Sequence, residues 1–231
     1  MFKKLILATL CSAAAMSGAQ AADSVDLKVT GTLTSGSCTP SLGNGGVVDF
    51  GHIPLGNLSK TETNQLGKKM TSLTITCTSE MIVGWQAVDN KHDTLKNLTV
   101  NKGFANGGNC TGSSSQFGLG KTHDDVNIGA YCLAVDVNNI TVDGVKSQFI
   151  EKSYLEDNSV WHTLAGGDLL NGSDGKWRTA SAAAESSMEP VAGKVFVYPL
   201  NVTAAIQGSD ALAITDETNL DGLATLSLVY I

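Results

Sequence analysis

Short runs in which apolar and polar residues alternate recur along the chain, and this pattern restricts it to an all-β fold. Period-two alternation is typical of strands that bury one face. Clusters of glycine and asparagine separate the runs and supply the positive φ angles that tight turns need. The alternating positions are Val25, Leu27, Val29 and Leu33, then Leu73, Ile75 and Cys77, then Val195, Val197 and Pro199. The sequence therefore predicts many short strands in a two-sheet β-sandwich.

Helical signals are sparse, and turn signals are frequent. The only helix-friendly stretch, Thr179–Met188, contains three consecutive alanines but no apolar stripe at helical spacing. Two Asp-Gly steps, Asp143-Gly144 and Asp174-Gly175, lie between strand-like runs and predict type I′ turns. We expect one sandwich domain over residues 29–231, with a loop- and hairpin-rich insertion at about 90–180.

The first residues have the pattern of a cleavable signal peptide. Lys3 and Lys4 precede an apolar run, Leu5–Met16, which is followed by Ala19-Gln20-Ala21. The run is too short for a membrane-spanning helix, which needs about 20 apolar residues. We therefore expect residues 1–21 to be removed on export. The whole chain has a formal net charge of -7 at pH 7, and losing two lysines makes the mature chain more acidic, which argues against nucleic acid as a partner.

The cysteine content predicts disulfides. With Cys11 removed in the signal peptide, four cysteines remain, an even number in an oxidising compartment. Of three pairings we favour Cys38 with Cys77 and Cys110 with Cys132, because each pair is consecutive and the second encloses a Gly/Ser-rich stretch. Each closed loop would stabilise the fold by roughly 3 to 4 kcal/mol. A zinc site would need close pairs of the C-x-x-C kind, which the sequence lacks, so we expect no metal and no cofactor.

The region around Cys38 resembles the opening of chaperone-usher fimbrial, or pilin-like, subunits. The resemblance is carried by Gly31–Pro40, by Val47–Pro54 and by Leu58. In that family the first cysteine is bonded to one at the end of the second strand, and Cys77 fits that place. The resemblance covers about the first sixty mature residues.

The far end of the chain agrees with this family. The last segment alternates, with Ala224, Leu226, Leu228 and Tyr230 on one face. The next-to-last residue of the chain is therefore aromatic, as in pilus subunits. In the family the final strand carries the chaperone recognition signal. The stretches Phe117–Gly120 and Asn127–Tyr131 are similar to those of uncharacterised enterobacterial fimbrial-like proteins, including the GltF-like ones.

The resemblance implies an incomplete immunoglobulin-like sandwich that lacks its seventh strand. Its open edges would be covered first by a periplasmic chaperone and then, after passage through an outer-membrane usher, by the N-terminal strand of a neighbouring subunit. The candidate donor strand is residues 22–28, with Val25, Leu27 and Val29 facing the groove. The expected role is a structural or tip subunit of a surface fimbria in cell adhesion. The protein would cross the inner membrane, pass through the periplasm and end at the cell surface.

A second interpretation stays open. Val25–Leu33 could be the first strand of the chain's own sheet, which would make it a self-complete periplasmic or secreted sandwich that binds a glycan or a small nutrient. Trp161 and Trp177 are candidate glycan contacts, although ring packing on the sandwich explains them as well. A host glycan or protein receptor is compatible with either interpretation.

No feature of the sequence predicts an enzyme. A hydrolase would need a nucleophile, a base and an orienting group, and the chain has no Gly-x-Ser-x-Gly elbow. The histidines are dispersed at His52, His92, His123 and His162. We therefore expect no catalytic residues.

Overall fold

The computed structural model describes residues 26–32, 35–153, 160–214 and 217–231. The chain divides into two compact units, Met1–Thr34 and Ser35–Ile231, which are considered separately. In the first unit, residues 26–32 belong to no strand or helix, and Leu27 and Val29 are exposed. The expected signal peptide at 1–21 and Val25 of the candidate donor strand lie outside the described residues.

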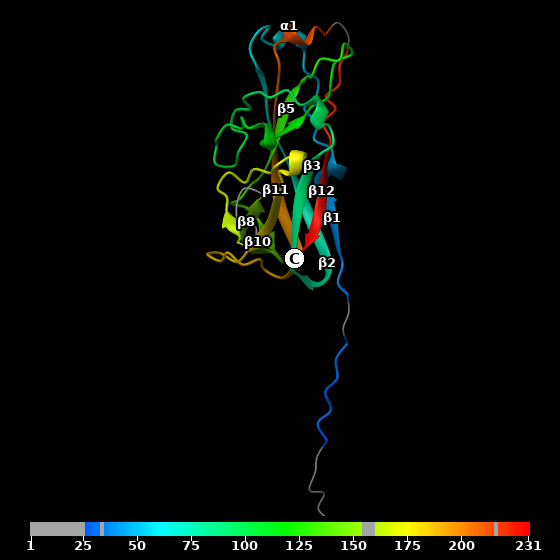
Figure 1. Cartoon of the computed structure of the whole chain (residues 1–231), viewed down its shortest axis with the longest axis vertical. Coiled ribbons are helices and arrows are strands. Elements are labelled where there is room, and N and C mark those ends of the chain that lie inside the picture. The colour runs from blue at the N-terminus through cyan, green and yellow to red at the C-terminus, as the bar shows by residue number, and fades with distance from the viewer. Residues whose placement is uncertain (1–25, 33–34, 154–159, 215–216) are drawn as a thin grey trace, which may run out of the picture. The chain divides into compact units, whose positions relative to one another are not determined.

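The second unit consists of two antiparallel sheets, as Figure 1 shows. The larger sheet has the order β1 (Cys38–Leu42), β2 (Asn64–Met81), β11 (Gly193–Ile206), β5 (Gly129–Val135) and β4 (Gln116–Gly118). A small hairpin, β6 (Thr141–Val142) and β7 (Val145–Lys146), is attached to β11. The smaller sheet has the order β12 (Ala224–Tyr230), β3 (Val83–Asp89), β10 (Arg178–Ala183), β8 (Gln148–Ser153) and β9 (His162–Thr163). The predicted all-β, two-sheet fold is confirmed.

Helical structure is limited to short pieces. Within the described residues there is one α-helix, α1 (Ser209–Leu212), and none of the helices there is long and apolar enough to cross a membrane. The 3-10 turns are η1 (Gly43–Gly46), η2 (Leu55–Asn57), η3 (His92–Thr94), η4 (Ser113–Ser115) and η5 (Ser173–Gly175).

The hydrophobic core lies between the two sheets, where the alternating residues of the long strands meet. Leu73, Ile75 and Cys77 of β2 are buried, whereas the threonines between them are half-buried or exposed. On the smaller sheet Trp85 of β3 is fully buried and meets Tyr198 of β11 edge to face, with ring centroids 5.4 Å apart. Successive strand residues point to opposite faces, so the predicted run at Leu73 marks the core face of β2. In β11 the predicted alternating residues lie on the opposite, more exposed face, and the core residues are Phe196, Tyr198 and Leu200.

Both predicted disulfides are confirmed. Cys38–Cys77 joins β1 to β2 in register. Cys110–Cys132 fixes the segment before β4 to β5. Around this second disulfide, a small separate cluster of Val100, Cys110, Ala130, Cys132 and Ala205 is fully buried. The insertion is therefore a packed layer over the outer face of β5 and β11 rather than a free loop.

The range 90–180 is more structured than the sequence indicates, because it contributes β5 to the larger sheet and β8 and β10 to the smaller one. The helix-friendly stretch begins as strand β10, which is buried at every position. Its inner face packs on the core, and on its outer face Ala183 packs with Ile150 and Trp161. Small side chains fit a strand that is covered on both faces, which explains alanine in place of branched residues.

Both Asp-Gly steps form the expected tight turn. Asp143 and Gly144 have φ angles of 51° and 79° and join β6 to β7 as a two-residue hairpin. Asp174 and Gly175 have φ angles of 52° and 71°, but no assigned ladder flanks this turn. Only the first step is therefore a β-hairpin.

Candidate functional site

The two long sides of the sandwich differ, and one of them is closed by backbone hydrogen bonds. The loop that follows β9 runs beside β5 on the larger sheet. Val135 N donates to Gly167 O at 2.7 Å, and Leu169 N donates to Leu133 O at 2.9 Å. These bonds satisfy backbone groups of β5 beyond the end of β4, so on this side a loop covers part of the edge that the short strands β4 and β9 leave.

A buried charge network reinforces the closed side. Arg178 Nε lies 3.2 Å from Glu151 Oε2, and its other nitrogen, Nη1, lies 2.6 Å from Asp168 Oδ2. The Arg178 and Glu151 side chains are almost fully buried. This network connects β10 and β8 to the loop that follows β9. Because its buried charges are paired with one another, we interpret it as structural.

The opposite side of the sandwich is open. There β1 and β12 lie side by side as the edge strands of the two sheets, as Figure 1 shows. Each has one partner, β2 for β1 and β3 for β12. Within the described residues, no backbone-to-backbone hydrogen bond joins segment 39–58 to segment 217–230. The two edges therefore keep unpaired backbone groups, which are ready to pair with an added strand.

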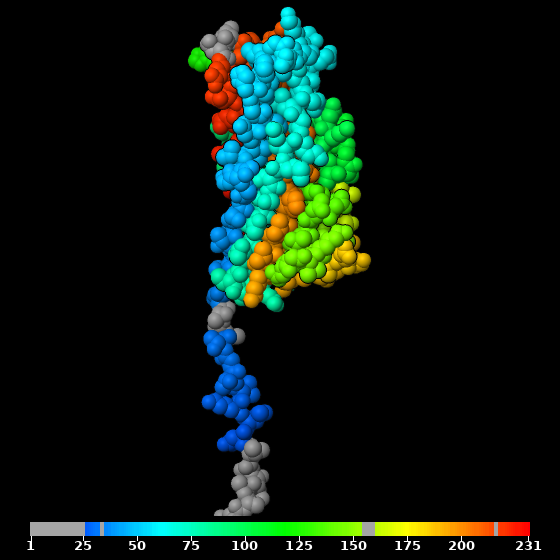
Figure 2. All heavy atoms as spheres, turned by 180° about the vertical axis from the view of Figure 1, so that it is seen from behind, coloured from blue at the N-terminus to red at the C-terminus, as the bar shows by residue number. Residues whose placement is uncertain are grey.

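The open side is tied together at both ends. At one end Cys38 N donates to Tyr230 Oη at 3.1 Å. At the other end Ser209 N, at the start of α1, donates to Ser59 O at 3.1 Å. Figure 2 shows the segment after β1, in blue, lying along β2, in cyan. A groove runs between the two ties, with segment 42–58 as one wall and residues 212–214 and 217–226 as the other.

The part of the groove near the middle of the sandwich is narrow and apolar, with a cavity of about 190 Å³. Half-buried residues of the core rim form its walls: Leu42, Val48 and Phe50 on one side, and Leu220, Ala224 and Leu226 on the other. Leu133, Leu200 and Val202 of the core form its floor. The core is therefore accessible from this side.

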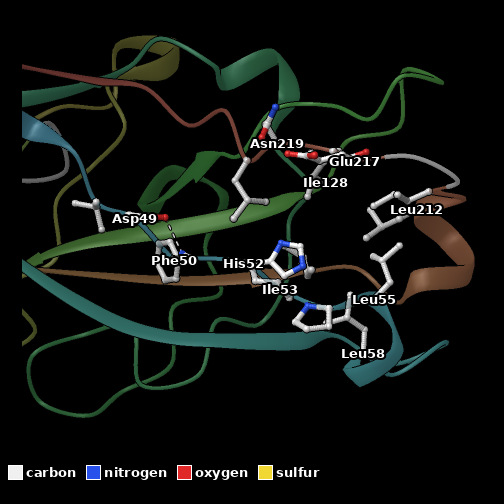
Figure 3. Close-up of a pocket in the computed structure, with 17 residues that line it drawn as sticks. Asp49, Phe50, His52, Ile53, Leu55, Leu58, Ile128, Leu212, Glu217 and Asn219 are labelled. Carbon is white, nitrogen blue, oxygen red and sulfur yellow. Dashed lines mark hydrogen bonds between the residues drawn. The ribbon is translucent and has the colours of Figure 1, made fainter.

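The groove widens toward α1 into a cavity of about 760 Å³, which Figure 3 shows. Val48, Phe50 and Leu220 line both cavities, so the two parts are continuous. The floor of the wide part is apolar and consists of Ile128, Ile206 and Leu212. Figure 3 shows Glu217 and Asn219 on one wall and Leu55 and Leu58 on the other.

Polar groups are confined to the rim of the wide part. Asp49 Oδ1 accepts a hydrogen bond from Gly51 N at 2.7 Å, which fixes the turn that carries His52. Glu217 and Asn219 are exposed on the facing wall. Within the described parts of the chain, no group of three or more His, Cys, Asp or Glu residues is placed to hold a metal ion. The arrangement is suited to an extended peptide: apolar pockets for alternate side chains and open strand edges for its backbone.

The wall that leads into β12 is anchored through the buried carboxylate of Asp89, at the end of β3. Asp89 accepts hydrogen bonds from Lys91 N at 2.9 Å and from Gly118 N at 2.8 Å. Burial raises the pKa of Asp89, and these two hydrogen bonds partly offset that rise. Beyond it, Lys91 Nζ lies 2.5 Å from Asp221 Oδ2, and Asn90 N donates to Leu223 O at 2.9 Å. These contacts fix the groove wall around Asp221 and Leu223 to the residues that follow β3.

Of the four predicted C-terminal residues, Ala224 and Leu226 line the groove. Ala224, Leu226 and Leu228 of β12 pack half-buried against the core, as the alternation predicts. Tyr230 is 55% exposed and lies at the end of the groove, where its hydroxyl contacts Cys38 N.

The tryptophans lie away from the groove. Trp161 is 7% exposed, with Lys152 Nζ 4.8 Å from its ring centroid, so little ring surface is free for a sugar. Trp177 is half-buried after the second Asp-Gly turn. Neither lines the narrow or the wide part of the groove. The candidate glycan contacts are therefore not part of the groove.

Sequence reasoning missed the wide part. Its floor combines Ile128, Ile206 and Leu212, which are far apart in the chain, and its wall follows an irregular segment without period-two spacing. The one local signal is the concentration of apolar residues at Phe50, Ile53, Leu55 and Leu58, outside any alternating run.

Comparison with known proteins finds a family model and relatives in Escherichia coli. The family model "Protein of unknown function (DUF1120)" matches residues 27–132. "Uncharacterized protein YhcF" of Escherichia coli (strain K12) is 33% identical over 92% of this chain and 93% of its own length. "Protein GltF" of the same organism is 28% identical over 99% of this chain and 98% of its own length. No solved structure matches. The chain therefore belongs to the DUF1120 family, together with YhcF.

Proposed function

We propose that this protein is a subunit of a surface fibre of the chaperone-usher type, and that its groove is completed by a β-strand from another polypeptide. The observation that carries the proposal is the difference between the two sides of the sandwich. One side is closed by the loop that follows β9, whereas the other exposes two strand edges and the core rim. An open edge beside an apolar groove is an aggregation hazard unless a strand covers it.

Three further features support the same role. The sequence begins with the pattern of an export signal, which would bring the chain to a compartment where its two disulfides form. Part of the resemblance to fimbrial subunits falls on the two walls of the groove, Val47–Pro54 on one side and the C-terminal strand on the other. In this role a periplasmic chaperone and a neighbouring subunit would occupy the groove in turn, after export and before adhesion at the cell surface.

A self-complete binding protein is the weaker interpretation. It would need the chain's own strand at Val25–Leu33 as part of a sheet, and residues 26–32 are not in a strand. The sheets begin at Cys38 instead. An enzyme has even less support, because the groove rim combines His52 with carboxylates but with no recognisable nucleophile motif.

Strand binding can be tested with two neighbouring residues that differ in orientation. Val48 lines both parts of the groove, whereas Val47 is 65% exposed and lines neither. We expect the mature protein to bind a ten-residue peptide with Val or Leu at alternate positions. The substitution Val48→Lys should lower the affinity at least tenfold, and Val47→Lys should leave it unchanged.

Titration calorimetry of the three proteins measures this difference. Equal losses in both variants, or a protein that binds no alternating peptide at all, would refute the proposed role. Co-expression with a chaperone from the same fimbrial system gives an independent check: a chain that is equally folded and soluble without it argues against the fibre subunit.

A further inference from the structure

The wide part of the groove is too large for the side chains that the chain's own N-terminal segment could bring. If that segment were extended as a strand, Val25, Leu27 and Val29 would share one face, and the next residue on this face, Gly31, has no side chain. Residues 22–34 contain no aromatic residue. A cavity of about 150 Å³ accommodates a benzene ring. One side chain therefore fills the narrow part of about 190 Å³, whereas the wide part of about 760 Å³ has room for an aromatic ring together with its neighbouring side chains.

The charge of the same segment is also mismatched. Asp49 and Glu217 make the rim of the wide part acidic. Residues 22–34 carry two carboxylates, Asp23 and Asp26, which offset Lys28 and the α-amino group that cleavage after Ala21 would leave, so the segment has no excess positive charge to meet the acidic rim. Asp23 shares the face of Val25, so it would point toward the groove. Like charges brought together at an interface oppose binding and exclude wrong partners.

We infer that the wide part receives an aromatic side chain from a partner strand that differs from a second copy of this chain. The inference rests on the proposed function, because it names the strand that the groove accepts. The aromatic ring covers the floor of Ile128, Ile206 and Leu212, and a neighbouring Lys or Arg of the partner meets the acidic rim. A second copy would fill the narrow part and leave water against this apolar floor. The groove therefore selects a different protein over self-assembly.

Peptides derived from the chain's own segment test the inference directly. The parent peptide spans Asp23–Leu33, and two variants place an aromatic residue on its groove face, at Gly31→Phe and at Asp23→Phe. Two positions are tested because a strand can enter the groove in either direction. Position 31 reaches the wide part in one direction, and position 23 reaches it in the other. We expect one of these variants to bind the mature protein at least tenfold more tightly than the parent. Thr30→Phe, on the opposite face of the strand, should bind like the parent.

A matched pair of protein variants shows where on the protein the aromatic residue of the peptide increases the affinity. Asn219→Trp introduces an indole on the wall of the wide part, where Asn219 is exposed. Asn138→Trp introduces the same group at an exposed turn that lines neither part of the groove. The advantage of the aromatic peptide should disappear in the first variant and remain in the second.

The outcomes separate the inference from the proposed function. A parent peptide that binds as tightly as both groove-face variants overturns the inference and leaves strand binding intact. An aromatic advantage that survives Asn219→Trp overturns it as well, because the ring would then be bound elsewhere. If none of the peptides binds, the proposed function fails and the inference fails with it.

Discussion

At the scale of single residues, Asp89 connects the core to the wall of the groove. Its carboxylate is fully buried and accepts the backbone N–H groups of Lys91 and Gly118. His92 Nδ1 lies 3.9 Å from Asp89 Oδ2, and its charge, when protonated, favours the ionised carboxylate, whereas Asp93 disfavours it. Burial is the largest of these effects and raises the pKa of Asp89.

This raised pKa predicts the pH dependence of stability. Because the pKa of Asp89 is higher in the folded than in the unfolded protein, folding favours the protonated carboxyl. Its contribution is fully present below the unfolded pKa of about 3.9 and is lost as the pH rises through the raised folded pKa. The free energy of unfolding of the wild type minus that of Asp89→Asn should therefore decrease from pH 4 to pH 7.

Urea unfolding at several pH values measures this difference. Asp125→Asn is a suitable control, because the side chain of Asp125 is 82% exposed. If this difference is constant or increases with pH, burial does not raise the pKa of Asp89.

Gly118 provides a test of close packing at the same junction. It is buried in β4, and a Cβ there would overlap the carbonyl oxygen of Lys91 and the hydroxyl of Thr94. Gly118→Ala should therefore destabilise the protein by about 1 to 3 kcal/mol, the usual effect of overpacking. Gly112→Ala, where a Cβ meets nothing within 4 Å, should have little effect on the urea midpoint. Equal midpoints for the two variants would contradict this packing.

At the scale of elements, the two disulfides close loops in different places. Cys38–Cys77 holds β1, one edge of the groove, to β2. Cys110–Cys132 holds the insertion to the outer face of β5, away from the groove. Replacing either pair by serine should destabilise the fold by roughly 3 to 4 kcal/mol. Only the loss of Cys38–Cys77 should also weaken strand binding, because β1 then loses its covalent tie.

Thermal unfolding of the two double-serine proteins measures their stability, and peptide titration measures their affinity for the strand. A protein that lacks Cys38–Cys77 but still binds the peptide with wild-type affinity would show that β1 needs no disulfide to form its edge. Binding lost equally in both proteins would indicate general unfolding.

Alternation predicted strands β2, β11 and β12, but residues 26–32 of the first alternating run are not in a strand, and alternation failed for β10, where both faces are covered. The runs around Leu73 and Val195 are in the long paired strands β2 and β11, and the last run is β12. Strand β10 was not predictable, because its alanines match a strand only when layers cover both of its faces. Pairing of the disulfides followed from their order along the chain.

The groove could be predicted only in part. Its C-terminal wall follows from the alternation at Leu226 and Leu228, and its opening wall follows from the resemblance around Cys38. The wide part could not be predicted, because it arises where α1, the segment before β5 and an irregular stretch meet. Contacts between residues far apart in the chain leave no periodic signal.

At the scale of the whole molecule, the second unit is a sandwich with one closed and one open side. The closed side is held by the loop that follows β9 and by the Arg178 network. The open side leaves half-buried core residues and two strand edges uncovered. A strand placed in the groove would bury apolar surface and pair both edges at once, so it should stabilise the entire sandwich rather than one element.

A strand appended to the C-terminus tests whether filling the groove stabilises the entire sandwich. Strand β12 ends at Tyr230, beside Cys38, so a short turn after Ile231 would let an added strand run back along the groove toward its wide part. The appended strand would repeat residues 24–31 with Gly31→Phe, which places the ring at the wide part. We expect the midpoint of thermal unfolding to rise by roughly 5 °C or more. Binding of an apolar dye should decrease, because the core rim is covered.

The matched control is the same fusion with Asp in place of the appended copies of Val25, Leu27 and Val29, which keeps the length and removes the apolar face. It should unfold like the parent protein, since a charged strand cannot occupy an apolar groove without leaving carboxylates buried and unpaired. Size-exclusion chromatography must show both fusions as monomers, because pairing between molecules would also raise the midpoint. If the apolar and the charged fusion unfold at the same temperature, the open side of the sandwich does not accept a strand.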